Sequence, residues 1–373
     1  MHLIQRKKIE LAQTSPEGIL IGEVPRLIDE WQNVPDLWNC ARTEVDNRES
    51  KFGQFIFTGS STSADINDIY HSGAGRIVTI PMTLSETNET KKIVSLSALF
   101  SGQNSLFYVN DNFSLYDIAF YICRGGWPLS LNDNKDISLR ITENYCSTLF
   151  NFENSKKKFR NKKPEIMRMI LRSYARNVST EVRRKTILTD VNEHDDRNLD
   201  PSTFDDYVDA LKDLFIIRDI EPWNPNFRSK TAIVSSPTRH FVDTSIAANS
   251  LGISPNDLIK DPNTFGLFFE DFVIKELSVY AMVLKGELRH YRDGNGLECD
   301  AVLHLKNGEY ALIEIKLDGE QLIADGIKNL NTLENKIINS NKYLPKFKII
   351  ITACGDAYIK NNVFIVPINI VTD

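Results

Sequence analysis

The segment LECDAVLHLKNGEYALIEIKL, residues 297–317, constrains the fold of this chain more than any other. Two runs of mostly apolar residues flank the tripeptide Lys-Asn-Gly, a pattern typical of a β-hairpin. If the Asn-Gly pair alone makes a two-residue turn, Asp300 lies opposite Ile315. If all three residues form the loop, with Gly308 in the left-handed conformation, Asp300 lies opposite Glu314. The choice of register therefore decides whether two acidic side chains meet.

We favour the three-residue loop because it sorts the side chains of the two strands better. It pairs Glu298 with Lys316 and places Asp300, Glu314 and Lys316 on one face, since alternate residues of a strand point the same way. The other face then carries Ala301, Leu303, Ala311, Ile313, Ile315 and Leu317. Two carboxylates that oppose each other across a strand pair are destabilising unless a positive charge lies between them.

A divalent metal ion would supply that charge. Paired carboxylates with a nearby lysine are the groups of metal-assisted phosphodiester hydrolysis: the acids hold Mg²⁺, the metal activates a water, and the lysine orients the water or stabilises charge. We therefore predict a catalytic Mg²⁺ site at Asp300, Glu314 and Lys316. The alternative is a cross-strand ion pair between Glu298 and Lys316 on a solvated sheet face.

The elements around this hairpin follow a recognisable order. The helical segment TFGLFFEDFVIKELSVYA precedes three extended runs, and the helical segment EQLIADGIKNLNTLENKI and two further strands follow. This order, with Asp300 and the ExK motif on the second and third strands, resembles the restriction-endonuclease-like PD-(D/E)xK superfamily. The resemblance implies an α/β nuclease fold, and Glu270 on the preceding helix matches an acidic metal-binding position of some members. Cys299 stands where the motif has proline.

The amino-terminal part, from Ile19 to Ala98, alternates short apolar runs with helical segments, which predicts parallel βα units. In RLIDEWQNVPDLW, Asp29 and Glu30 follow an apolar strand, as do the acids of many P-loop ATPases that hold Mg²⁺ and orient a water. A helix-capping acidic pair is the alternative. No GxxxxGK[ST] phosphate-binding loop occurs in the 373 residues.

Several blocks together resemble the prokaryotic AAA-type ATPases that carry a C-terminal domain of unknown function. They include RLIDEWQNVPDLW, FGQFIFTGSST, HSGAGRIVTIPMTLSE, YICRGGWPLSL and RHFVDTSIAANSLGI, and the resemblance extends over residues 19–317. It implies ATP and Mg²⁺ as ligands. The residues that it assigns to nucleotide chemistry are Asp29 for Mg²⁺, Glu30 for the attacking water, Thr58 or Ser60 on the sensor strand, and Arg76 for charge stabilisation. Because the phosphate-binding loop is missing, we expect an amino-terminally incomplete domain with impaired ATP binding.

Three helical segments and a strand between residues 164 and 222 fit a winged helix-turn-helix. The third helix of such domains often reads DNA, but here it carries Asp205, Asp206, Asp209 and Asp213, which would repel phosphates. The segment Lys156–Lys185 instead has twelve lysines and arginines against two acids. We predict that DNA binds through this basic region, with a solvated helix face as the alternative.

Composition limits the remaining possibilities. The formal net charge is −6, so any contact with nucleic acid has to be local. The five scattered cysteines contain no CxxC pair and argue against a disulfide frame or structural zinc. Because no signal-like or membrane-spanning run is visible, we expect a cytoplasmic protein.

These patterns predict an α/β multidomain protein. We expect a truncated P-loop ATPase-like domain over residues 1–104, a helical connector over 105–160, a winged helix over 161–222 and a restriction-endonuclease-like domain over 223–373. The leading hypothesis is an AAA-type ATPase-family protein with a nuclease-like C-terminal domain that acts on or near DNA. The second is a Mg²⁺-dependent DNA nuclease. The third is a non-enzymatic protein that binds DNA, another protein or further copies of itself.

Overall fold

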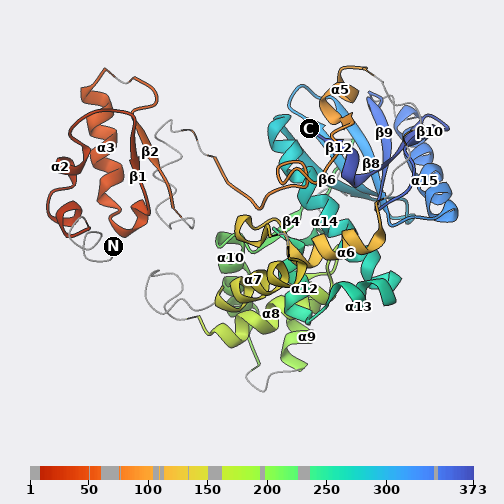
Figure 1. Ribbon diagram of the computed structural model, residues 1–373, viewed down its shortest axis with the longest axis horizontal. Helices are drawn as coiled ribbons and strands as arrows, with labels where there is room; N and C mark the ends of the chain where they lie inside the picture. Colours follow the sequence, from red (N-terminus) through yellow and green to blue (C-terminus); the bar gives the residue numbers. More distant parts are fainter. Residues whose placement is uncertain are drawn as a thin grey trace. The chain divides into compact units, whose positions relative to one another are not determined.

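The computed structural model describes residues 9–49, 51–59, 75, 77–103, 109, 113–132, 134–149, 162–193, 198–225, 236–339 and 343–373. This part of the chain has an α/β fold and divides into two compact units (Figure 1). The smaller unit comprises the amino-terminal residues up to Val78. The larger unit comprises most of the described residues from Thr79 to Asp373.

The smaller unit is built on a two-stranded parallel sheet. β1 (Arg26–Ile28) pairs with β2 (Phe55–Phe57), and this parallel pairing agrees with the predicted βα organisation. Its helices are α2 (Pro16–Leu20), a 3-10 turn (Trp31–Asn33) and α3 (Asp36–Asn47). One face of the sheet packs on a core formed by Ala12, Leu20, Ile28, Trp31, Val34, Leu37 and Ala41. The other face exposes Leu27 and Ile56 by 63% and 52%, although parallel sheets are usually covered on both faces.

The larger unit contains a six-stranded sheet in the order β10-β11-β9-β8-β7-β6. Its strands are β6 (Gly286–Arg292), β7 (Glu298–Leu305), β8 (Tyr310–Lys316), β9 (Phe347–Thr352), β10 (Tyr358–Lys360) and β11 (Val363–Pro367). Strands β6, β7 and β8 form an antiparallel meander, whereas β8, β9 and β11 run parallel. A short strand β12 (Val371–Thr372), after the 3-10 turn Ile368–Ile370, pairs with β3 (Val94–Ser95).

Two long helices pack on this sheet (Figure 1). α15 (Glu320–Asn339) connects β8 to β9, and its buried Ile327, Leu330 and Leu333 share a core with Val302 and Leu312 of the sheet. α14 (Pro262–Val283) precedes β6 and approaches the opposite face, where its Gly266 would bring an added Cβ to 3.9 Å from Leu317. None of the described helices is long and apolar enough to cross a membrane.

The remaining helices of the larger unit lie before α14 in the chain. They are α5 (Leu96–Phe100), α6 (Leu115–Arg124), the 3-10 turn Pro128–Ser130, α7 (Lys135–Thr148), α8 (Pro164–Arg176), α9 (Arg184–Glu193), α10 (Pro201–Asp213), α12 (Thr244–Leu251) and α13 (Pro255–Lys260). An antiparallel pair, β4 (Ile217–Ile220) and β5 (Thr238–Phe241), follows α10. A parallel bridge from Pro222 to His290 continues the chain after β4 alongside β6.

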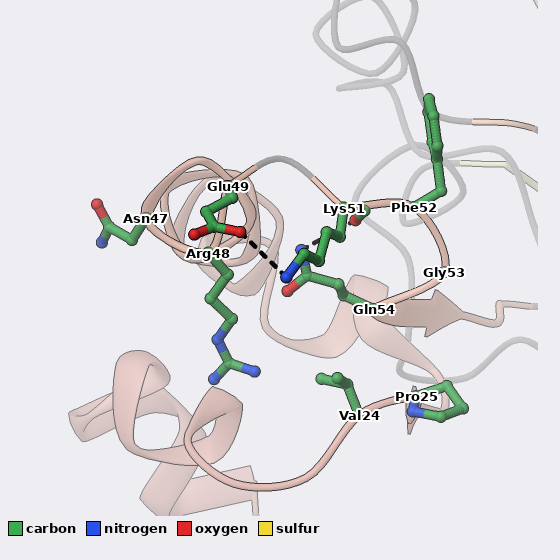
Figure 2. A pocket seen from close by; sticks show the side chains of 9 residues that line it. All are labelled: Val24, Pro25, Asn47, Arg48, Glu49, Lys51, Phe52, Gly53 and Gln54. Carbon is green, nitrogen blue, oxygen red and sulfur yellow. Dashed lines mark hydrogen bonds and ion pairs between the residues drawn. The ribbon is translucent and has the colours of Figure 1, made fainter.

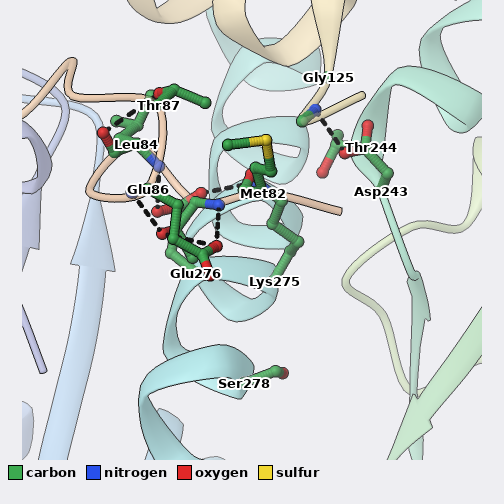
Figure 3. Close-up of polar contacts among 12 residues, drawn as sticks. Met82, Leu84, Glu86, Thr87, Gly125, Asp243, Thr244, Lys275, Glu276 and Ser278 are labelled. Atoms are coloured by element: carbon green, nitrogen blue, oxygen red, sulfur yellow. Dashed lines mark hydrogen bonds and ion pairs between the residues drawn. The ribbon is translucent and has the colours of Figure 1, made fainter. Parts of the chain in front are cut away.

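Two charged side chains in the middle of α14 hold the segment that follows the smaller unit (Figure 3). Lys275 is 3% exposed and donates to the Met82 carbonyl at 2.7 Å, while the buried Glu276 accepts from the Leu84 amide at 2.9 Å. An added Cβ on Gly126 would lie 2.1 Å from the Met82 carbonyl oxygen, so only glycine fits there. Residues 79–103 thus pack as part of the larger unit. The division after Val78 lies earlier in the chain than the boundary predicted after residue 104.

Candidate functional site

The register of β7 and β8 is the one predicted for a three-residue loop. Ala301 pairs with Ile313, and Gly308 adopts a φ of 89°, a conformation that glycine reaches without strain. Asp300 and Glu314 are the next positions along the two strands. The prediction that these carboxylates meet at one end of the hairpin is confirmed.

The Asp300 carboxylate lies where the two strands separate. Its Oδ2 accepts a hydrogen bond from the main-chain N–H of Ile315 at 2.7 Å. The same oxygen lies 3.0 Å from Nζ of Lys316, which also contacts Oε2 of Glu314 at 2.6 Å. One lysine thus bridges two carboxylates from neighbouring strands. The three predicted residues form one cluster at the carboxyl end of β8.

Burial sets the protonation of this cluster. Glu314 is 1% exposed, and this burial, together with the Asp300 charge, raises the pKa of its carboxyl to about 8. Burial alone would lower the pKa of Lys316, but Asp300 and Glu314 raise it above its ordinary value. Lys316 therefore stays charged. The Oε1 atom of Glu314 is buried and has no hydrogen-bond partner among the described residues.

Glu270 of α14 adds a third carboxylate to the electrostatics of the cluster. Burial raises the pKa of Glu270 well above its ordinary value, and the charges of Asp300 and Glu314 raise it further. Part of Glu270 remains accessible to solvent. Its carboxyl interacts electrostatically with both of these carboxylates. Its role as a metal ligand remains a prediction.

The alternative of a solvated Glu298–Lys316 ladder is wrong. Glu298 pairs with Arg292 at 3.1 Å. Val302 and Leu312, which lie on the same face as Asp300 and Glu314, belong to the core beneath α15, so this face is covered rather than solvated. The sequence pattern led us to expect one apolar face, but α14 and α15 cover the two faces of the sheet.

Asp300 and Glu314 fit the needs of Mg²⁺ in one respect. Mg²⁺ keeps several waters and usually takes one or two protein carboxylates together with substrate phosphates. The unpartnered, buried Oε1 of Glu314 is an oxygen donor of the required kind. A complete protein cage is absent, because no group of three His, Cys, Asp or Glu residues in the described part of the chain is arranged to hold a metal.

One buried group near the cluster was missed by the sequence reasoning. Thr352, at the end of β9, pairs with Lys316 in the parallel register and is 1% exposed. Its Oγ1 is a second buried oxygen without a partner among the described residues. The strand-helix-strand order of β8, α15 and β9 could have predicted that Thr352 lies near the cluster, because parallel strands joined through a helix place their carboxyl ends at one edge of the sheet.

A second polar cluster, formed by Thr238, His240 and Asp271, has the composition of a nucleophile-histidine-aspartate triad. Nδ1 of His240 lies 3.0 Å from Asp271, and its Nε2 lies 2.9 Å from Oγ1 of Thr238. All three side chains are buried, and Asp271 also accepts hydrogen bonds from the Phe241 amide and the Thr244 hydroxyl. The cluster therefore joins β5 and α12 to α14 and has no access for a substrate.

In the smaller unit, the parallel pairing brings Asp29 and Thr58 together. Both residues follow their strands, and Oγ1 of Thr58 donates to Oδ1 of Asp29 at 2.6 Å. Glu30 adopts a left-handed φ of 52°. The other two residues assigned by the resemblance, Ser60 and Arg76, lie outside the described residues.

A hollow of about 580 Å³ lies at the opposite ends of these strands (Figure 2). Its lining comes from Val24 and Pro25, before β1, and from residues between Asn47 and Gln54, before β2. Open α/β sheets bind ligands beyond the carboxyl ends of their strands. This hollow therefore lies away from Asp29 and Thr58 and is not part of a site with them.

The basic region is partly described. Lys156 to Asn161 lie outside the described residues. Exposed cations lie on α8 and α9 or directly before these helices, at Lys163, Arg168, Arg172, Arg176, Arg183 and Lys185. The acidic helix α10 is turned toward part of this charge, since Arg184 pairs with Asp205 at 2.7 Å and with Asp209 at 3.4 Å.

Replacing Lys316 tests whether the two carboxylates demand a positive charge. Lys316→Met leaves Asp300 and Glu314 facing each other, and we expect a loss of about 3 kcal/mol in the free energy of unfolding, as for other broken buried pairs. Because a divalent ion would replace the lost charge, millimolar MgCl₂ should raise the melting temperature of this variant more than that of the native chain. Thermal melts with and without MgCl₂ measure both effects.

Lys336→Met is the matched control, since it breaks the surface pair of Lys336 with Asp293. An equal response of both variants to MgCl₂ would contradict a cation requirement at Asp300 and Glu314.

Comparison with known proteins gives two partial matches to family models. Residues 115–257 match a domain of unknown function, DUF8612, and residues 265–371 match another, DUF4143. The second match begins in α14 and includes Glu270, Asp300, Glu314 and Lys316. The change from one model to the other falls near the start of α14.

The chain is also similar to two mycobacterial proteins. It is 28% identical over 110 residues to the uncharacterized protein Mb2031c of Mycobacterium bovis and, with the same identity and length, to the uncharacterized protein Rv2008c of Mycobacterium tuberculosis. The matched residues make up 30% of this chain and 24% of each relative. The similarity thus spans about a quarter of the length of these relatives.

Proposed function

We propose that the larger unit is a metal-dependent nuclease of the PD-(D/E)xK type. The observation that carries the proposal is the single cluster of Asp300, Glu314 and Lys316 at the point where β7 and β8 separate. The order of α14, the β6-β7-β8 meander, α15 and β9 supports it, since it is the order expected for the restriction-endonuclease-like fold. The acidic Glu270 on α14 interacts electrostatically with Asp300 and Glu314.

The residues of the cluster have separable roles in phosphodiester hydrolysis. Asp300 and Glu314 would hold Mg²⁺, which, when bound, supplies Lewis acidity and lowers the pKa of a bound water. The Asp300 carboxylate is held in place by the Ile315 amide, so its position does not depend on the ion. Lys316 keeps its charge and 22% of its side chain exposed, so its ammonium can orient a water or stabilise charge on the phosphate.

Cleavage of duplex and single-stranded DNA in MgCl₂ or MnCl₂ tests this proposal. We expect divalent-metal-dependent nicking that falls by about 100-fold or more in Asp300→Ala, because that change removes a metal ligand. Glu298→Gln is the matched control, because it removes a neighbouring carboxylate that pairs with Arg292. Nicking that survives Asp300→Ala contradicts the proposal. A chain that binds DNA but never cleaves it supports a non-enzymatic binding protein instead.

We propose DNA as the substrate because of the charges on α8 and α9. The order α8, α9, α10, β4, β5 is that of a winged helix, and Arg168, Arg172 and Arg176 repeat every four residues on the exposed side of α8. Phosphate contacts by such residues supply most of the affinity of sequence-independent binding. The acidic α10 pairs with Arg184 and is unsuited to reading a groove.

Charge reversal on α8 and α9 tests the DNA surface. Arg172→Glu with Arg183→Glu should weaken DNA binding and lower the slope of log K against log salt by about 1 per residue. Gel shifts at several salt concentrations measure this slope. The control is Lys328→Glu on the exposed side of α15, which makes the same charge change elsewhere. Equal weakening by Lys328→Glu would contradict a local basic surface.

A second candidate function belongs to the smaller unit, which we propose derives from an AAA-type ATPase domain. The hydrogen bond between Thr58 and Asp29 at the ends of two parallel strands supports this origin, because it joins two residues that the resemblance assigns to Mg²⁺ binding and to the sensor strand. DUF4143 domains are often found in AAA-ATPase-associated proteins. The phosphate-binding loop is missing from the 373 residues.

Titration with labelled ATP and Mg²⁺ tests the ATP-binding capacity of this chain. A phosphate-binding loop supplies the main-chain N–H donors and lysine for the phosphates, so we expect no saturable binding in the micromolar range. Asp29→Ala is the control, and it should leave the weak signal unchanged. Micromolar binding that Asp29→Ala removes would contradict this expectation and indicate a working nucleotide site.

A further inference from the structure

Two buried side-chain oxygens lack a partner at the same end of the parallel strands β8 and β9. They are Oε1 of Glu314 and Oγ1 of Thr352, whose residues are each 1% exposed. A buried oxygen that gives up water without gaining a hydrogen bond costs free energy, so such atoms usually have a ligand or a bound water. Two of them together point to one shared ligand.

The strand register places both oxygens on one face of the sheet. Glu314 pairs with Ile350, and Lys316 pairs with Thr352. Residues paired across strands point to the same side, as do residues two apart on one strand. Thr352 therefore lies beside Lys316, two residues further along the strands than the Glu314–Ile350 pair.

α15 covers this face closely. At Gly326 an added Cβ would lie 3.0 Å from Cδ1 of Ile350 and 3.7 Å from Cβ of Glu314. The glycine lets the helix approach the sheet over the Glu314–Ile350 pair. The end of β9 is tied to the end of β8 by a hydrogen bond from the Ala353 amide to the Leu317 carbonyl at 2.8 Å. Thr352 is thus held rigidly next to the cluster.

We propose that Thr352 is a positioning residue of the metal site, where its hydroxyl binds a water of the metal's hydration shell. This inference depends on the proposed metal site at Asp300 and Glu314. Neighbouring strands are about 4.8 Å apart, so Thr352 lies directly next to its paired residue Lys316 of the cluster. A threonine hydroxyl can donate to one oxygen and accept from another. Mg²⁺ retains several of its waters, and outer partners of this kind orient the ligands of a metal.

Titration of the full chain with MnCl₂, followed calorimetrically, tests the role of Thr352. We expect Thr352→Val, which keeps the shape but removes the hydroxyl, to weaken Mn²⁺ binding by about 10- to 100-fold, as for other outer partners of metal ligands. Thr352→Ser keeps the hydroxyl and should bind Mn²⁺ within about twofold of the native chain. Thr142→Val is the control, because it removes a buried hydroxyl far along the chain that donates to the Arg124 carbonyl.

The metal-free melting temperature separates this role from a structural one. Because Oγ1 of Thr352 has no partner in the described chain, Thr352→Val should melt at or above the native temperature without metal. A lower metal-free melting temperature with unchanged Mn²⁺ affinity would mean that the hydroxyl holds a structural water, and would overturn the inference. If Thr352→Val fails to fold, this also indicates a structural role, provided that Thr352→Ser behaves like the native chain.

Asp300→Asn distinguishes the inference from the proposed function. Mn²⁺ binding that Asp300→Asn removes and Thr352→Val leaves intact would overturn the role of Thr352 and keep the metal site. If the native chain binds no Mn²⁺ at all, both the metal site and the role of Thr352 are overturned.

Discussion

The hydrogen bond from the Ile315 amide to the Asp300 carboxylate determines the geometry of the candidate site. In a regular hairpin this amide would donate its hydrogen bond to a main-chain carbonyl of the neighbouring strand. Because it donates to a side chain instead, β7 and β8 separate at this point. Lys316 then reaches back to both Asp300 and Glu314. The site therefore exists because a side chain replaces the main chain as acceptor at the end of the hairpin.

Helix α14 supports the larger unit from its other side. Its charged residues are buried for different reasons: Asp271 organises β5 and α12, and Lys275 with Glu276 holds the main chain at Met82 and Leu84. Glu270, one residue before Asp271, interacts electrostatically with the cluster of Asp300, Glu314 and Lys316. One helix thus ties together the segment after the smaller unit, the β4–β5 pair and the carboxylate cluster. The buried charges of Asp271, Lys275 and Glu276 are tolerated because each is paired or hydrogen-bonded.

The two candidate sites of the chain differ in completeness. Asp29 and Thr58 meet at the ends of two parallel strands, but the sheet has only these two described strands and leaves one face exposed. The cluster at Asp300 lies in a six-stranded sheet covered by two helices, where burial strengthens every electrostatic interaction. For this reason the larger unit carries the main functional proposal.

Sequence by itself was sufficient for the hairpin register and for the meeting of Asp300, Glu314 and Lys316, because the Lys-Asn-Gly loop and the strand period of two act locally. It was also sufficient for the parallel direction of β1 and β2. The tertiary structure decided the rest. Only the packing of α15 shows that the face with the carboxylates is buried. Only the parallel register of β8 and β9 brings a second unpartnered oxygen to the site, because it pairs Lys316 with Thr352, 36 residues later in the chain. Both depend on contacts between segments distant in the chain, which no local pattern encodes.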